Sequence, residues 1–300
     1  MFKIAYCDNY YFQLPEGHKF PIQKYDLLPR QLLYEGTVEE SQFFVPELVA
    51  LDRLESVHTS EYIQKFTGLE LSPREQRITG FVHNEALVKR ELTLVEGTRM
   101  CAHHALVDGI AFNIAGGTHH AYSDKGEGFC MLNDQAVAAQ SLIDDGIVER
   151  ILIVDLDVHQ GQGTAQIFED STSVFTFSMH GKNNYPLRKE RSYRDVELDD
   201  NCSGDTYLSI LKRELDDLKT KVNPEFIFFQ CGVDVLATDK LGRLGLTIDE
   251  CKARDEYVLS WCKGNNLPVV CTMGGGYSPD VKTVVEAHAN TYRVASQLFF

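Results

Sequence analysis

The stretch ILIVDLDVH, residues 151–159, begins as an unbroken apolar run and ends in two aspartates and a histidine. Five further apolar runs lie along the chain, at residues 2–7 (FKIAYC), 110–117 (IAFNIAGG), 173–180 (SVFTFSMH), 225–232 (EFIFFQCG) and 268–276 (PVVCTMGGG). Both faces of these runs are apolar, which is typical of strands buried on both sides in a parallel sheet.

Helix-like segments alternate with these runs. They cover residues 84–108, 133–144, 205–222, 249–263 and 278–300. This alternation predicts right-handed crossovers and an α/β fold with a doubly wound, mostly parallel sheet flanked by helices. No linker rich in proline, glycine or serine interrupts the pattern, so we expect a single domain spanning residues 1–300.

The composition, with 43% hydrophobic and 24% charged residues, is that of an ordinary soluble globular protein. The net charge of −15 argues against nucleic-acid binding, which needs a basic face. No run of about eighteen apolar residues predicts a membrane span, and the first residues lack the pattern of a signal peptide, so we expect a cytoplasmic protein. Eight cysteines without a CxxC spacing predict free thiols rather than disulfides or a zinc finger.

Polar residues follow four of the apolar runs. In open α/β sheets, ligands bind outside the carboxyl ends of the strands, so these are the positions that favour a functional site. They are Thr118, His119 and His120 after one run, Asp155, Asp157 and His159 at the end of another, Asp234 after a third and Tyr277 after the last. Carboxylates, imidazoles and a phenol are therefore expected at one edge of the sheet.

The segment DLDVH predicts a metal site. Side chains at every second position of an extended segment share a face, so Asp155, Asp157 and His159 are expected to point the same way. Buried carboxylates without a partner are unfavourable, and a cation removes that penalty. Asp157, His159 and Asp234 offer an oxygen and nitrogen set suited to zinc or a similar divalent ion, with a position left for water. The alternative is that the aspartates cap a helix and the histidine binds backbone.

The chain contains two histidine pairs. His103 and His104 fall inside a predicted helix, where neighbouring side chains point about 100° apart, so we expect surface or packing roles. His119 and His120 follow a strand and two glycines, at the expected metal site, and are the better candidates for acid–base catalysis.

Six motifs follow one another along the chain: GHKFPIQKY at 17–25, VHTSEYI at 57–63, GGTHHAYSDKGEGFCMLND at 116–134, DLDVHQGQGTA at 155–165, GVDVLATDKLGRLGLT at 232–247 and GGGY at 274–277. In this order they resemble the zinc-dependent histone deacetylase superfamily, with the arginase–deacetylase fold, and look nearest to its class IV and bacterial members. The resemblance covers nearly the whole chain and implies hydrolysis of an acyl-lysine-type amide, either acetyl or a longer fatty acyl group.

The resemblance implies roles for the residues named above. Asp157, His159 and Asp234 would hold one Zn²⁺. His120 would act as general base and then acid, and His119 as its electrostatic partner.

Further positions follow from the same resemblance. Asp155 would orient His119, and Tyr277 would donate to the oxyanion. Positions that would bind substrate are Thr118, Gly128, Phe129, Tyr185 and Gly275, with Phe129 and Tyr185 as walls of the acyl-lysine channel. A structural K⁺ is expected near Asp155, Asp157, His159 and Ser178. The expected partner is an acylated lysine peptide or protein, or a small acylated amine.

The chain departs from the family pattern at two positions. Gln162 stands where relatives usually carry Asp or Asn as the partner of the second histidine, and a neutral amide does not raise the basicity of that histidine as a carboxylate does. Thr118 replaces a bulky aromatic residue, so we expect space at the channel floor for acyl groups longer than acetyl.

Other functions stay open on the sequence alone. An acetylpolyamine or another small amide suits the same chemistry, although the first half of the chain has no long insertion to narrow the entrance. An arginase-like binuclear manganese site is disfavoured because GVDVLATD spaces its acids too far apart. A non-catalytic acyl-lysine-binding module is expected to lose Tyr277 or one of the paired histidines, and the chain keeps them. Neither GxGxxG nor GxxxxGK[ST] occurs, which disfavours nucleotide binding.

Overall fold

A computed structural model describes all residues of the chain, 1–300. Its strands form one eight-stranded parallel sheet in the order β2-β1-β3-β8-β7-β4-β5-β6. The strands are β1 (Lys3–Ala5), β2 (Phe43–Phe44), β3 (Ile110–Asn113), β4 (Ile151–Asp155), β5 (Val174–Gly181), β6 (Arg194–Leu198), β7 (Phe226–Gln230) and β8 (Val269–Thr272). The predicted α/β fold with a parallel sheet is therefore confirmed.

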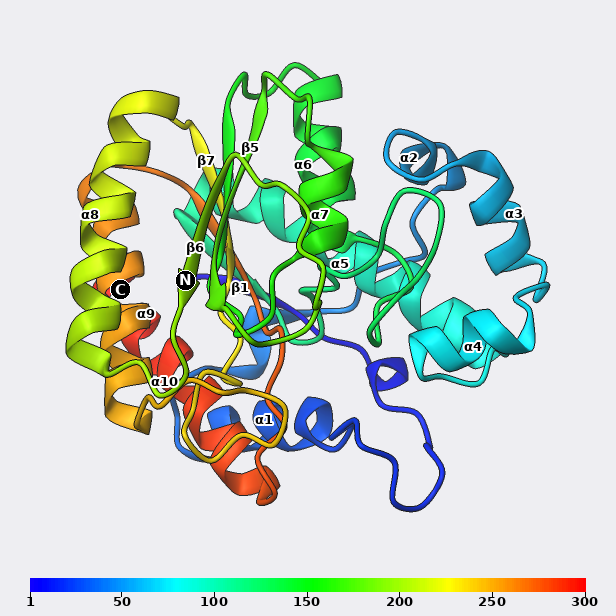
Figure 1. The fold of residues 1–300 in the computed structure, drawn as a ribbon, viewed down its shortest axis with the longest axis horizontal. Helices are drawn as coiled ribbons and strands as arrows, with labels where there is room; N and C mark the ends of the chain where they lie inside the picture. The colour runs from blue at the N-terminus through cyan, green and yellow to red at the C-terminus, as the bar shows by residue number, and fades with distance from the viewer.

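Helices cover both faces of the sheet (Figure 1). They are α1 (Lys24–Tyr34), α2 (Leu51–Glu55), α3 (Ser60–Thr67), α4 (Pro73–Thr79), α5 (Glu85–Asp108), α6 (Asp134–Asp144), α7 (Gln162–Ile167), α8 (Gly204–Val222), α9 (Ile248–Gly264) and α10 (Val281–Phe299). In Figure 1, α8, α9 and α10 lie on one side of the sheet and α5 and α6 on the other, while α2 to α4 form a group at the edge of the molecule. None of these helices is both long and apolar enough to cross a membrane.

Side-chain caps fix where the predicted helices begin. Asn84 and Asn133 accept hydrogen bonds from the first turns of α5 and α6, which satisfies backbone donors that the helices leave free. The last helix begins at Val281 rather than at residue 278, because Asp280 is its N-cap. The strands β2 and β6 were not predicted from the sequence. They are the two edge strands, one only two residues long and the other largely unburied.

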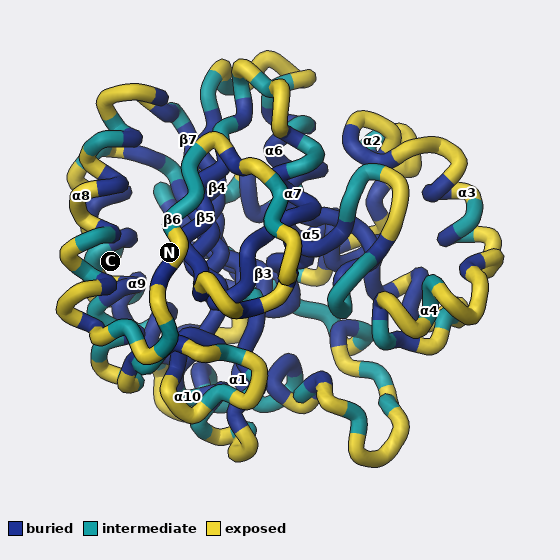
Figure 2. Tube along the Cα trace, in the orientation of Figure 1, coloured by how far each residue is buried: buried dark blue, intermediate teal, exposed yellow.

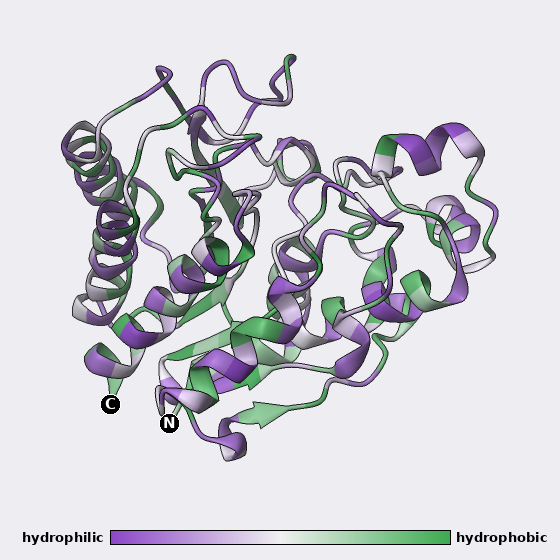
Figure 3. Ribbon diagram, turned by 90° about the horizontal axis from the view of Figure 1, so that it is seen from below, coloured by the Kyte–Doolittle hydropathy of each residue, from purple (hydrophilic) through white to green (hydrophobic).

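The core lies in the central strands. Every residue of β3, β4, β7 and β8 is buried, and Figure 2 shows this dark centre surrounded by exposed loops and helix faces. Figure 3 shows the same contrast in hydropathy, with hydrophobic strands between helices that carry hydrophilic segments. Eight free cysteines are present, six of them buried, as the sequence predicts. This packed centre holds the loops at the carboxyl ends of the strands.

Candidate active site

Four neighbouring strands deliver the candidate residues to one edge of the sheet. The strands β3, β8, β7 and β4 lie side by side, and Asn113, Thr272, Gln230 and Asp155 pair with one another in register at their carboxyl ends. The loops that follow these strands contain His119 and His120, Tyr277, Asp234, and Asp157 with His159. The convergence that the sequence predicts is therefore present in the fold.

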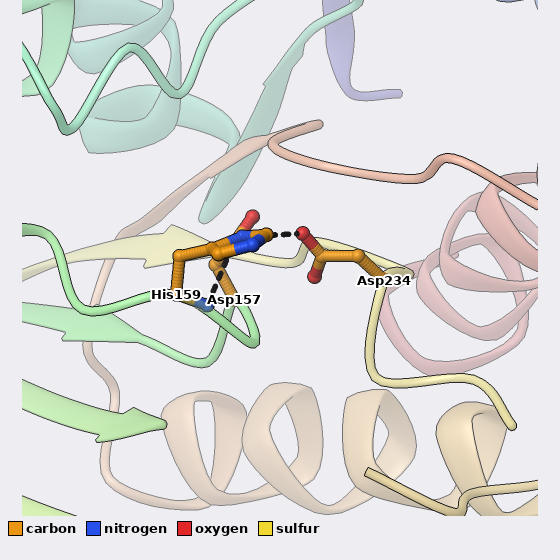
Figure 4. A group of neighbouring side chains, drawn as sticks. All are labelled: Asp157, His159 and Asp234. Atoms are coloured by element: carbon orange, nitrogen blue, oxygen red, sulfur yellow. Dashed lines mark hydrogen bonds and ion pairs between the residues drawn. The ribbon is translucent and has the colours of Figure 1, made fainter. Parts of the chain in front are cut away.

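Asp157, His159 and Asp234 converge on one point (Figure 4). The Nδ1 atom of His159 lies 3.0 Å from Oδ1 of Asp157 and 3.1 Å from Oδ2 of Asp234, and one ligand atom from each residue falls within 4.8 Å of the others. All three side chains are buried. Two carboxylates and an imidazole, held together out of water, are a donor set that fits a divalent cation such as zinc.

The backbone around this group differs from the extended segment that the sequence predicts. The strand β4 ends at Asp155, and residues 157–159 form a bend. Within the bend, the backbone N–H of Asp157 donates to Oδ1 of Asp155, and that of His159 donates to Oδ1 of Asp157. The expectation of a fully extended segment was wrong, because these aspartate side chains accept from backbone N–H groups two residues on and turn the chain. The bend still brings Asp157 and His159 together.

The electrostatics of the group follow from burial and crowding. Burial lowers the pKa of His159, but its hydrogen bonds to Asp157 and Asp234 and their charges raise it to about 10. Burial and the charge of Asp157 raise the pKa of Asp234 to about 7.

Gly275 brings its backbone close to both carboxylates and donates to Oδ2 of Asp157 at 2.8 Å. A Cβ atom at Gly275 would lie 1.9 Å from Oδ2 of Asp234, so only glycine fits there.

The paired histidines have different partners. Nδ1 of His119 lies 2.7 Å from Oδ2 of Asp155, and Nδ1 of His120 lies 2.6 Å from Oε1 of Gln162. Burial lowers the pKa of His119, but the charges of Asp155 and Asp157 outweigh burial and raise it overall. Burial lowers the pKa of His120 well below its usual range, and the charges of His119 and His159 lower it further.

These opposite shifts separate the roles that the two histidines can take. When the pKa values of two neighbouring groups are pushed apart, one is held charged and the other neutral. The charged form of His119 is thereby favoured, whereas His120 is favoured in its neutral form, in which one ring nitrogen has a free lone pair. The other pair behaves as the sequence predicts: His103 is exposed on α5, and the ring of His104 packs on Phe44 at a centroid distance of 4.9 Å.

A channel leads from the surface to this group. Its cavity of about 440 Å³ is lined by Ile78, His120, Glu127, Gly128, Phe129, His159, Tyr185, Leu241 and Tyr277. The ring of Tyr185 lies edge-on to that of His120 at 5.3 Å, and the rings of Phe129 and Tyr277 lie 6.1 Å apart. Burial raises the pKa of the Tyr277 hydroxyl well above its usual range, so this group stays protonated and can donate a hydrogen bond at neutral pH.

A second, smaller cavity lies next to Asp157 and His159. This cavity of about 30 Å³, with Tyr25, Arg90 and Thr118 among its lining residues, has room for about one or two water molecules. The Thr118 hydroxyl lies 2.5 Å from the carbonyl oxygen of Leu132 and 2.7 Å from Oδ1 of Asp134. The cavity beside Thr118 is therefore small, and the acyl length that the site accepts stays a prediction.

The position expected for a potassium ion lies between β4 and β5. Ser178 pairs with Asp155 in the register of these strands, and its Oγ lies 2.9 Å from Nδ1 of His180. His180 is buried, and its Nε2 has no hydrogen-bond partner. These neighbours are polar, and the identity of any ion there stays a prediction.

Two residues near the site were not singled out from the sequence. Lys24 is buried, donates from Nζ to the carbonyl oxygen of Gly274 at 2.8 Å, and lies 5.9 Å from the ring centroid of Tyr277. Glu127 lies at the channel mouth and accepts a hydrogen bond from Tyr185. Both fall inside motifs quoted above, but nothing in their spacing indicates which side chains they meet.

Comparison with known proteins gives a consistent result. The sequence profile of the histone deacetylase domain matches residues 18–292. An uncharacterized protein of Picosynechococcus sp. is 42% identical over 298 residues, which cover 99% of each chain. Histone deacetylase 2 of Arabidopsis thaliana is 29% identical over 297 residues, which cover 94% of this chain and 76% of the Arabidopsis protein. The crystal structure of an HDAC homologue complexed with SAHA is similar in fold, with a TM-score of 0.84 at 24% identity, over 99% of this chain and 84% of that chain.

Proposed function

The chain belongs to the histone deacetylase family, and from that premise we propose that it hydrolyses the amide of an acylated lysine, or of a similar acylated amine, with one zinc ion. The observation that carries the proposal is the buried group of Asp157, His159 and Asp234 beside two buried histidines, each bound through Nδ1 to a neighbouring side chain. We propose these three residues as the zinc ligands.

The bound ion would supply Lewis acidity, polarising the amide carbonyl and lowering the pKa of a water molecule toward about 7. The protein's own residues do the rest. Because Nδ1 of His120 is bound to Gln162, its Nε2 is left to take a proton from the attacking water and to return it to the departing amine. His119, held by Asp155, stabilises negative charge beside it.

Tyr277 and the channel complete the proposed machinery. The protonated Tyr277 hydroxyl is suited to donate a hydrogen bond to the oxyanion that forms as water adds to the carbonyl. Phe129 and Tyr185 supply apolar walls for the stem of a lysine side chain. A structural potassium ion near Asp155 and Ser178 belongs to the same proposal.

The size of the inner cavity supports a short acyl group. A chain several methylene groups longer than acetyl needs more space than the 30 Å³ beside Thr118. We therefore propose acetyl, and not a long fatty acyl group, as the substrate. A lysine peptide and a small acetylated amine such as an acetylpolyamine both present this group, and direct comparison of the two separates them.

The test is turnover of acetyl-, octanoyl- and myristoyl-lysine peptides and of an acetylpolyamine by the purified protein, with and without a chelator. We expect turnover of acetyl-lysine that the chelator abolishes. Tyr277→Phe is expected to lower kcat by about 10²- to 10³-fold, because one oxyanion donor is lost. Tyr34→Phe is the matched control, since Tyr34 is 95% exposed on α1. Turnover that is indifferent to both the chelator and Tyr277→Phe would contradict the proposal.

A further inference from the structure

The side chain of Gln162, which contacts His120, also contacts a second residue, Tyr185. The amide Nε2 of Gln162 lies 3.4 Å from the hydroxyl oxygen of Tyr185, and the Tyr185 hydroxyl donates to Oε1 of Glu127 at 2.5 Å. Nζ of Lys125 lies 3.4 Å from the other oxygen of Glu127. A continuous chain of polar contacts therefore runs from the buried base to a carboxylate at the channel mouth.

We propose that Tyr185 and Glu127 are positioning residues for His120, which fix the amide orientation of Gln162 and through it the tautomer of the imidazole. This inference rests on the proposed function, in which His120 is the general base. Tyr185, which lines the channel, would thus both contact the substrate and orient Gln162.

The direction of the hydrogen bonds follows from the carboxylate. An ionised carboxylate only accepts, so Glu127 takes the single O–H of Tyr185. The Tyr185 oxygen can then act toward Gln162 only as an acceptor, which requires the NH₂ end of the amide on that side. The amide oxygen must therefore face His120, and Nδ1 of the ring must carry the proton. Nε2 is left with its lone pair toward the channel.

The surroundings make the tautomer, rather than the charge, the property that needs control. His120 is buried, which favours the neutral form of its ring, and its Nδ1 contacts the neutral amide of Gln162 instead of a carboxylate. The ring is thus neutral at neutral pH, and its single proton can sit on either nitrogen. An amide can present its oxygen or its nitrogen to Nδ1, whereas a carboxylate presents only oxygen. With Gln162 at this position, something else has to set the orientation, and Tyr185 with Glu127 does so.

The test uses two conservative variants. Tyr185→Phe keeps the aromatic wall and removes only the hydroxyl, and Glu127→Gln keeps the size of the side chain and lets it donate. Tyr193→Phe is the matched control, because Tyr193 is half exposed and its ring packs on Phe175. Because Tyr185→Phe keeps the ring and removes one hydroxyl from a partly exposed side chain, we expect the variant to fold.

Two readouts are needed. In ¹⁵N-histidine NMR spectra, wild type is expected to show His120 as one neutral tautomer with the proton on Nδ1, and both variants to show a share with the proton on Nε2. In turnover of acetyl-lysine peptide, kcat is expected to fall about tenfold in both variants with KM nearly unchanged, which is the usual size of such an indirect effect. If Tyr185 serves only as a channel wall, Tyr185→Phe leaves both readouts unchanged.

A double variant gives the decisive comparison. In Gln162→Glu, a carboxylate accepts directly from His120, so the orientation no longer depends on Tyr185. Adding Tyr185→Phe to Gln162→Glu is therefore expected to have no further effect on kcat. An unchanged tautomer in Tyr185→Phe and Glu127→Gln overturns the inference. Because the spectra need no turnover, they decide it even if no acetylated substrate is cleaved, which separates its failure from failure of the proposed function.

Discussion

His58 shows how a single buried histidine sets a pH limit on stability. Its Nδ1 lies 3.0 Å from the carbonyl oxygen of Tyr122, and the backbone N–H of Asn133 donates to its Nε2 at 3.0 Å. A ring that donates at one nitrogen and accepts at the other is neutral. Burial accordingly lowers the pKa of His58 to about 4.

This shift predicts a loss of stability in acid. The unfolded chain binds a proton at His58 below about pH 6.5, whereas the folded chain does so only near pH 4. The contribution of neutral His58 is therefore complete above pH 6.5 and is lost as the pH falls to 4, with an upper size of about 3 kcal/mol. In urea unfolding from pH 4 to 8, the free energy of unfolding of His58→Gln should fall less steeply below pH 6.5 than that of wild type. The exposed His103→Gln should change this pH dependence less, because only partial burial lowers the pKa of His103. Equal pH dependence of His58→Gln and wild type would refute the prediction.

Residue types at strand ends predicted which ligand candidates come together, and contacts between loops decided the rest. Asp157, His159 and Asp234 were predictable because the carboxyl ends of parallel strands share one edge, even though the segment bends instead of running straight. The contacts among Gln162, Tyr185 and Glu127 were not predictable. They join the first residue of α7 to two loops, and the approach of these segments depends on the packing of the whole fold.

The helix α5 packs against the sheet through Gly97. A Cβ atom at this position would lie 2.5 Å from Oη of Tyr10, 2.9 Å from Nδ2 of Asn113 and 3.2 Å from Cβ of Ala5. Asn113 is itself held to the helix, because its Nδ2 donates to the carbonyl oxygen of Leu94. The close approach of helix to sheet therefore requires glycine here.

Gly97→Ala should accordingly destabilise the protein although alanine favours helices. Overpacking of a tight core usually costs about 1–3 kcal/mol, against a gain of about 1 kcal/mol in helix propensity. Gly264→Ala is the matched control, since Gly264 lies in α9 with nothing within 4 Å of an added Cβ atom, and it should be neutral or stabilising. The free energy of unfolding from chemical denaturation measures both. A stability of Gly97→Ala equal to that of Gly264→Ala would show that α5 can move away from the sheet.

Capping and periodicity explain which elements were predictable. The long helices begin within a few residues of the predicted positions, because residues such as Asn84 and Asn133 mark their first turns in the sequence. The edge strand β6 (RDVEL) carries charged residues and lacks an apolar run, so its place in the sheet comes from pairing with β5 and not from its own pattern. The helices α1 to α4, which precede Asn84, were not among the predicted segments.

At the scale of the whole molecule, the proposed metal ligands follow two neighbouring strands inside the sheet. Asp157 and His159 follow β4, and Asp234 follows β7, which is the neighbour of β4 in the sheet. The doubly wound architecture was predictable because it rests on the alternation of many elements and tolerates an error in any one of them. A cation bound between these loops would link two segments about seventy-five residues apart, and the unfolded chain has no such site.

Binding to the folded state alone must raise its stability. A ligand at one hundred times its Kd adds about 2.7 kcal/mol, so zinc added to chelator-treated protein should raise the Tm, and a chelator should reverse the change. Asp234→Asn should remove the zinc-induced shift, because a neutral amide replaces one of two carboxylates in a buried group. Asp216→Asn, which alters an exposed aspartate on α8, should keep the full shift and controls for unspecific binding to the acidic surface. An equal zinc-induced rise in Tm in Asp234→Asn and Asp216→Asn would place the ion elsewhere. If only Asp234→Asn loses the rise, the ion binds at the carboxyl ends of β4 and β7, and this result needs no substrate.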